Sequence, residues 1–140
     1  MKYNIYISDI DKKKVLQLPV NPETLPSFSY SSKNEEFETF NNGTYNIIGD
    51  VGLMSFSLES FFPSQDKEYP FQKVFGKAAS EYVNLIKTAQ LNKKPIRVVI
   101  QRNTGSYILN GTFSVESFEY HTNKRNDIEY SLELKEWRKY

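Results

Sequence analysis

The stretch from Ile47 to Pro63, which reads IIGDVGLMSFSLESFFP, constrains the fold more than any other part of the chain. At its centre, apolar side chains alternate with serine and glutamate, a period of two that is typical of a strand with one buried and one polar face. The apolar members of this alternation are Met54, Phe56 and Leu58. The stretch therefore predicts a core strand of a half-buried sheet.

The two flanks of this stretch indicate how the strand begins and ends. Gly49 and Gly52 lie on either side of Asp50, a pattern that indicates a tight turn directly before the strand. A Phe–Phe doublet then precedes Pro63, which has no N–H group to donate to a ladder. We therefore expect a turn, a core strand and an abrupt exit.

The composition limits both size and chemistry. The chain has 140 residues with ten Phe, ten Tyr, one His and no Cys, and its formal net charge is +1. This length fits a single domain, which we expect to span residues 1–140. The aromatic content favours β structure, the absence of Cys excludes disulfides, and the near-neutral charge provides no global field to attract nucleic acid or anionic lipid.

Targeting signals are not evident in the sequence. The first 14 residues alternate between apolar and polar instead of forming the continuous apolar core of a signal peptide. No apolar run approaches the length of a membrane span. We therefore expect synthesis in the cytoplasm and no membrane insertion.

Further strands follow from the same alternation. An opening hairpin is expected from residues 3–8 and 15–18, and the turn sequence at Asn41–Gly43 predicts that two short strands meet there. The run 96–100 predicts another strand, followed by a short strand at 108–109 that ends in a turn at Asn110–Gly111. The buried parity changes near Glu116–Ser117, which predicts a β-bulge, and residues 128–135 give the clearest half-buried strand.

Between the central stretch and these later strands, the period changes. From Val74 to Ala89 the apolar residues recur at three- and four-residue spacings, which predicts one amphipathic helix that ends before Pro95. Its apolar stripe suits packing on the core better than packing on a partner helix. Eight or nine strands and one helix predict an α+β fold, in which a mostly antiparallel β-barrel or sandwich carries one flanking α-helix.

The residues give no indication of catalysis. His121 is placed in a polar turn without a Cys or Ser partner, and no glycine-rich phosphate loop occurs. The carboxylate pairs Glu116 with Glu119 and Glu129 with Glu133 fit a solvated strand face better than an acid–base site. We therefore expect no enzyme activity, no catalytic residues, no metal and no cofactor. A small β-barrel that binds a ligand or single-stranded nucleic acid stays an alternative, although the arginines are dispersed.

Three sequence elements carry a resemblance to a known family. These elements are QLPVNP at Gln17–Pro22, the GL and SFFP elements within Gly52–Pro63, and LKEWR at Leu134–Arg138. They resemble the N-terminal domain of the LysM-bearing tail proteins of contractile phages, phage-like elements and R-type bacteriocins, the XkdP-like group. Members of this family continue into a LysM module, whereas this chain stops at Tyr140 without one, so cell-wall binding is not carried over.

The resemblance implies a tail-tube-like fold and a structural role in the baseplate. The domain would act as a tube initiator or adaptor, a homo-oligomer in the form of a hexameric ring that joins the hub to the first ring of the tail tube. Its implied partners are the tail tube protein and the baseplate hub, with wedge or sheath proteins as further candidates, and it would not recognise nucleic-acid sequence. It would be made in the bacterial cytoplasm and assembled into a phage tail or tailocin particle.

Two polar segments are the candidate assembly elements. Exposed loops are where contacts between subunits usually lie, and strand edges can also be satisfied by pairing across subunits. We expect the loop from Ser31 to Asn42 and the turn from His121 to Asn126 to take this part. The candidate residues are Ser31, Ser32, Lys33, Asn34, Glu35, Asn41, Asn42, His121, Thr122, Asn123, Lys124 and Arg125.

Overall fold

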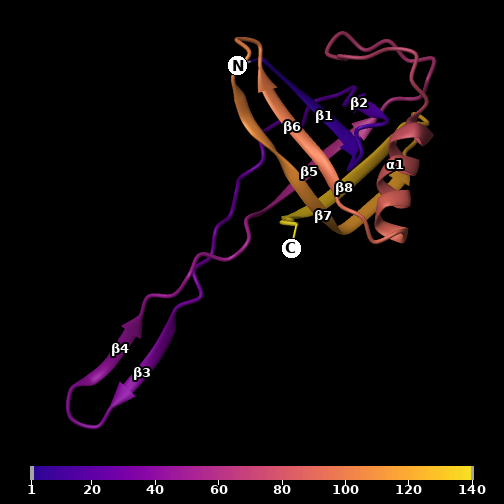
Figure 1. The fold of residues 1–140 in the computed structure, drawn as a ribbon. Helices are drawn as coiled ribbons and strands as arrows, with labels where there is room; N and C mark the ends of the chain where they lie inside the picture. The colour runs from indigo at the N-terminus through magenta and orange to yellow at the C-terminus, as the bar shows by residue number, and fades with distance from the viewer. Residues whose placement is uncertain (1, 140) are drawn as a thin grey trace.

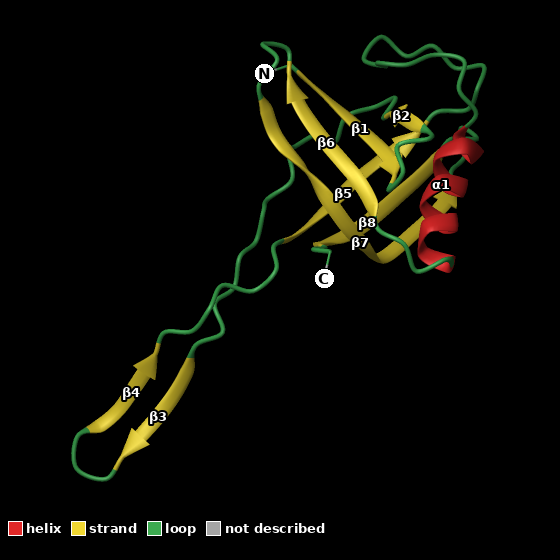
Figure 2. Ribbon diagram, viewed as in Figure 1, coloured by secondary structure: helices red, strands yellow, loops and turns green. Residues whose placement is uncertain are grey.

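The computed structural model describes residues 2–139, and the body of the molecule is one antiparallel sheet with a single helix against it (Figures 1 and 2). The sheet has six strands in the order β2-β1-β6-β7-β8-β5, and β3 and β4 form a separate two-stranded sheet. The elements are β1 Tyr3–Asp9, β2 Val15–Gln17, β3 Glu35–Thr39, β4 Gly43–Ile47, β5 Ser55–Phe62, α1 Ala79–Leu91, β6 Ile96–Arg102, β7 Tyr107–Thr122 and β8 Ile128–Glu136. The predicted α+β class is confirmed.

The sheet folds over itself but does not close. β7 is 16 residues long and bends, so that β1 and β6 cross over β5 and β8 (Figure 2). The edge strands β2 and β5 do not pair with each other, which makes the barrel form of the prediction wrong. The outer edge of β5 instead meets an earlier segment, because Ser29 and Ser55 exchange two backbone hydrogen bonds and the Ser60 hydroxyl donates to the Val20 carbonyl.

β7 pairs with strands in both halves of the sheet, and it contains a β-bulge. The pairing of β7 with β8 shifts register between Val115 and Ser117, as the change of parity predicts. The predicted turn at Asn110–Gly111 is wrong. Both residues lie inside β7, where Asn110 pairs with Val99 and Gly111 pairs with Val98, because the β6–β7 ladder holds this segment extended.

The core lies between the two halves of the sheet and α1. Inward-facing residues of all six strands of the main sheet are buried, and the helix adds Tyr82, Val83, Ile86 and Ala89. Phe62 lies stacked between Tyr82 and Tyr130, with ring centroids 4.9 and 4.2 Å away. The core-facing stripe of the helix is therefore confirmed.

The helix begins later than the sequence period predicts. It starts at Ala79 and not at Val74, because Ala78 is extended and Gly76 has a φ of +75°. Phe75 is consequently half exposed in the preceding loop. No helix in residues 2–139 is long and apolar enough to cross a membrane.

A long arm leaves the body at the start of β5. We define the arm as residues 29–55, which run away from the sheet on the side opposite α1 and end in the β3–β4 hairpin (Figure 1). The predicted meeting of two strands at Asn41–Gly43 is confirmed, but these strands belong to the arm and not to the main sheet.

Candidate assembly site

The two candidate segments lie at opposite ends of the sheet. The loop segment, including Ser31 to Glu35, Asn41 and Asn42, belongs to the arm, which enters β5 at Ser55. The other segment lies at the far end of β5, where Phe62 pairs with Ile128. The structure therefore does not bring the two predicted segments together.

Backbone hydrogen bonds hold the two limbs of the arm side by side. The Lys33 N–H donates to the Asp50 carbonyl at 2.7 Å, and the Gly52 N–H donates to the Ser31 carbonyl at 2.6 Å. A Cβ at Gly49 would collide with the Lys33 carbonyl oxygen, so only glycine permits this approach. The predicted tight turn around Asp50 is wrong, because Gly49 and Gly52 lie in an extended limb, where they allow the other limb to approach closely.

The hairpin at the end of the arm has two chemically different faces. Phe37 pairs with Tyr45 and Glu35 with Ile47, so one face is largely apolar. On the other face, Glu36 and Glu38 pair with Asn46 and Thr44. The two faces follow directly from the period of two within EEFET and GTYNI.

The apolar side chains of the hairpin are exposed to solvent. Phe40 at the tip has a relative exposure of 102%, and Phe37, Tyr45 and Ile47 exceed 50%. A hydrogen bond closes the tip, because the Thr39 hydroxyl donates to the Gly43 carbonyl at 2.7 Å. An isolated two-stranded hairpin is marginal in water, so this exposed face is suited to packing against another surface.

The second candidate segment is a compact turn. His121 and Thr122 end β7, so the placement of His121 in a turn is wrong. Asn123 then organises the turn, since its side-chain oxygen accepts from the backbone N–H groups of Arg125 and Asp127. Lys124 and Arg125 are exposed.

Asp127, which the sequence reasoning did not single out, anchors this turn to the loop that follows β5. Its carboxylate is 1% exposed and accepts hydrogen bonds from the Ser64 N–H at 2.9 Å and the Tyr69 hydroxyl at 2.6 Å. Lys67 Nζ lies 3.9 Å from the same carboxylate and donates to the Arg125 carbonyl. The only sequence feature that could have indicated this role is the position of Asp127 directly before the half-buried strand β8.

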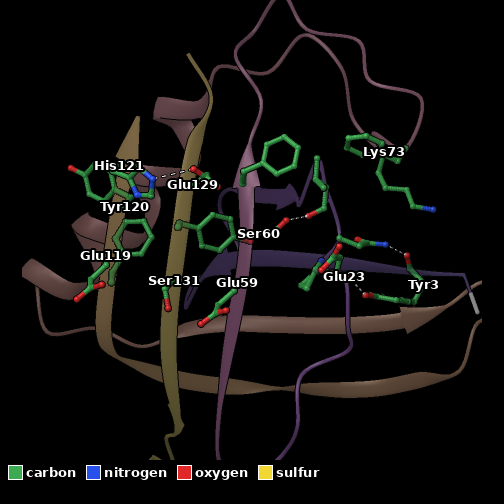
Figure 3. A pocket seen from close by; sticks show the side chains of 17 residues that line it. Tyr3, Glu23, Glu59, Ser60, Lys73, Glu119, Tyr120, His121, Glu129 and Ser131 are labelled. Atoms are coloured by element: carbon green, nitrogen blue, oxygen red, sulfur yellow. Dashed lines mark hydrogen bonds and ion pairs between the residues drawn. The ribbon is translucent and has the colours of Figure 1, made fainter. Parts of the chain in front are cut away.

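A wide hollow of about 1490 Å³ lies over β5, β7 and β8 (Figure 3). Four glutamates and one lysine line it, namely Glu23, Glu59, Glu119, Glu129 and Lys73. His121 also lines it, and its Nε2 lies 3.0 Å from Glu129. We call this feature the acidic hollow, and its charge opposes the binding of phosphate groups.

The carboxylates of the acidic hollow are not arranged as a metal site. Within residues 2–139, no group of three His, Cys, Asp or Glu side chains is placed to bind a metal ion. Glu119 pairs with Ser131 across the β7–β8 ladder, whereas the Glu116 carboxylate accepts from the Ser114 hydroxyl. The hollow offers an acidic surface.

Several solved structures have a similar fold. The tail of an empty GTA particle with C6 symmetry matches with a TM-score of 0.58 and 12% identity, over 97% of this chain and 91% of that chain. The fold is that of tail-tube and baseplate proteins. The SPP1 tail tube matches at 0.56 and 17% identity over 96% of this chain and 72% of that chain. The six-fold symmetrised baseplate of the anti-feeding prophage (AFP) matches at 0.54 and 9% identity, over 98% and 89%.

Comparison of the sequence with known proteins identifies no family for this chain. No protein-family model and no curated protein matches the chain. The structural neighbours are structural components of tails, baseplates and contractile injection systems, two of them described with six-fold symmetry. The resemblance to the LysM-bearing tail proteins stays a prediction.

Proposed function

We propose that this chain is a structural, non-enzymatic subunit of a hexameric ring in a phage tail or tailocin particle. More specifically, it would act as the tube initiator or adaptor that joins the baseplate hub to the first ring of the tail tube. The observation that carries this proposal is the arm, whose apolar face has no packing partner among residues 2–139. A ring subunit would cover that face with a neighbouring molecule.

The fold of the body supports the same role. Its neighbours include a C6 tail and a six-fold baseplate, and both are aligned over nearly the whole of this chain. The three sequence elements that resemble the XkdP-like group favour the adaptor position over that of an ordinary tube subunit. The proposed partners are copies of this chain, the tail tube protein and the hub, with wedge or sheath proteins as further contacts, after synthesis in the bacterial cytoplasm.

Electron microscopy of the chain mixed with the tail tube and hub proteins tests this proposal. We expect single rings of this chain on the hub, and tube growth only from those rings. The control omits this chain and should show hubs without tubes. Long tubes formed by this chain alone would contradict the adaptor role, and its absence from every ring and tail particle would contradict the proposal as a whole.

A monomeric binding module is the competing function, and the acidic hollow is the observation in its favour. Its volume exceeds that of most small-molecule sites, and it is open along the sheet. Its four glutamates make single-stranded nucleic acid a poor occupant. A chain that stays monomeric in the presence of tube and hub proteins, yet binds a small cationic ligand, would favour this alternative.

A further inference from the structure

The sequence Asn-Gly-Thr occurs twice in the chain, in very different surroundings. One copy begins at Asn42 at the tip of the arm, and the other begins at Asn110 inside β7 of the main sheet. In an Asn–Gly pair, the backbone nitrogen of glycine can attack the side-chain carbonyl carbon of asparagine, because glycine has no Cβ to hinder the approach. The two copies have the same local chemistry, so the fold decides which of them reacts.

The reaction at such a pair needs only water. The glycine nitrogen loses its proton and forms a bond to the asparagine Cγ, and the side-chain amino group leaves as ammonia. Water then opens the resulting succinimide at one of its two carbonyl groups, which gives aspartate or isoaspartate. The attack requires the nitrogen to lie about 3–3.5 Å from Cγ in the correct orientation, so a backbone that is held rigidly elsewhere does not react.

The tip of the arm leaves Asn42 free to reach this geometry. Asn42 and Gly43 are both exposed, and apart from chain neighbours no atom lies within 4 Å of the place where a Cβ of Gly43 would be. The Asn42 backbone N–H donates to the Thr39 hydroxyl at 3.1 Å, whereas its side-chain amide has no hydrogen-bond partner among residues 2–139. The side chain that is attacked can therefore rotate.

The hairpin that carries this tip can open without disturbing the body. β3 and β4 pair with each other in a sheet of their own and add no ladder to the main sheet. A two-stranded hairpin is marginally stable in water, so it opens at a small cost in free energy. Each opening lets the backbone at Asn42 and Gly43 sample the geometry of attack.

Asn110 is held through both its backbone and its side chain. In the β6–β7 ladder, Asn110 pairs with Val99 and Gly111 pairs with Val98. The Asn110 side-chain oxygen also accepts a hydrogen bond from the Arg97 guanidinium at 2.6 Å. Because β6 lies inside the main sheet between β1 and β7, this segment is released only when the main sheet opens.

We propose that Asn42 is a site of spontaneous deamidation and that the fold protects Asn110 from the same reaction. The arm tip of an unassembled chain then changes with time from a neutral amide to a carboxylate. Residues 29–55 already carry one lysine against three glutamates and one aspartate, so the product adds to an existing negative charge. The isoaspartate form also lengthens the backbone between Thr39 and Gly43, the pair that closes the hairpin.

The inference goes beyond the proposed function, because it holds whether or not the chain enters a ring. Peptide mapping by mass spectrometry tests it on the full chain, incubated in the folded state at about pH 8 and sampled over days. We expect Asn42 to convert about 10-fold faster than Asn110 or more, because the hairpin opens more readily than the main sheet. An intact Asn42, or equal rates at Asn42 and Asn110, would overturn the inference.

The unfolded chain is the matched control for the role of the fold. In concentrated guanidinium chloride, neither Asn-Gly-Thr copy has a ladder or a side-chain hydrogen bond, so the two rates should agree within about 3-fold. Agreement would show that the difference in the folded chain comes from the fold. A ratio as large as in the folded chain would show that sequence neighbours select Asn42, and it would overturn the protection of Asn110.

A substitution at the tip checks the chemistry of the reaction. Asn42→Gln keeps the amide but moves its carbonyl one methylene further from the Gly43 nitrogen, so conversion at this position should fall about 10-fold or more. Unchanged conversion at position 42 in this variant would contradict attack by the Gly43 nitrogen. The rate at Asn42 should also rise with pH, because the attacking nitrogen must lose its proton. A rate that is the same at about pH 7 and about pH 9 would contradict the same step.

Discussion

Phe62 in the body and Phe40 in the arm show how the same side chain serves two purposes in this molecule. Phe62 is fully buried between Tyr82 and Tyr130, whereas Phe40 is fully exposed at the tip of the hairpin. The body withdraws its aromatic rings from water and gains stability from doing so. The arm keeps its rings in water, and the proposed ring assembly would bury them against another molecule.

Truncation of these two residues should give the largest contrast. Phe62→Ala should lower the free energy of unfolding by about 3–5 kcal/mol, because it removes a fully packed ring and leaves a cavity. Phe40→Ala, the matched control, should change it by less than about 0.5 kcal/mol in the isolated chain. Denaturant titration of both variants measures this contrast. Equal losses would mean that the arm packs on the body in solution.

The anchor at Asp127 should give the next largest effect. Asp127→Ala leaves the Ser64 N–H and the Tyr69 hydroxyl without their acceptor, which should cost about 2–3 kcal/mol. Asp127→Asn keeps one acceptor oxygen and should cost less. Thermal unfolding compares the two variants. If Asp127→Ala were as stable as the native chain, Asp127 would not anchor the β7–β8 turn to the loop that follows β5.

Tyr130 offers a smaller effect of opposite sign. Its hydroxyl is buried and has no hydrogen-bond partner among residues 2–139, so Tyr130→Phe should raise the free energy of unfolding by about 1 kcal/mol. Tyr82→Phe is the contrasting variant, because the Tyr82 hydroxyl donates to the Gln17 carbonyl at 2.8 Å and its loss should destabilise. Stabilisation by both variants would contradict this account.

The same two tyrosines predict how stability responds to alkali. Burial raises the pKa of Tyr82 to about 12 and also raises the pKa of Tyr130. Between about pH 10, where tyrosines of the unfolded chain lose their protons, and pH 12, the folded chain retains more protons. Stability should therefore fall as the pH rises through this range. Tyr130→Phe should fall less steeply than the native chain in denaturant titrations at pH 9 and pH 11.

The smallest change in global stability is expected for Gly49→Ala, which acts only on the arm. The new Cβ collides with the Lys33 carbonyl and should separate the two limbs. We expect faster hydrogen exchange at the Lys33 amide. The free energy of unfolding of the body should change by less than about 0.5 kcal/mol. Gly52→Ala, whose Cβ would lie 3.1 Å from the Ser31 carbonyl, should have a milder effect. Loss of body stability would show that the arm and the body unfold as one unit.

The predictions from sequence were most accurate where a local period matches a regular element. Alternation located β1, β5 and β8 closely, the β-branched run at 96–100 located β6, and the change of parity located the bulge in β7. They failed where tertiary pairing overrides local preference. Asn110–Gly111 is a turn sequence in isolation, but the β6–β7 ladder keeps it extended. The helix start was missed because Val74 and Phe75 continue the apolar period although Gly76 interrupts the helical backbone.

The candidate site was predicted only in part. The polar residues Lys33, Asn34, Asn41 and Asn42 do lie on the arm, yet the apolar face that includes Phe37 was not singled out. Apolar and polar residues alternate in the hairpin strands, but they alternate in the same way in the core strands. A period of two shows that a strand has two faces. It does not show whether the apolar face meets its own core or solvent.

The sequence by itself therefore determined most of the strands, the single helix, the hairpin at Asn41–Gly43 and the absence of cysteine chemistry, because these depend on residues close together in the chain. Only the tertiary structure decided that the sheet stays open and that the hairpin projects as an arm. These features depend on which distant segments pair, and each pairing is chosen by the packing of the whole core.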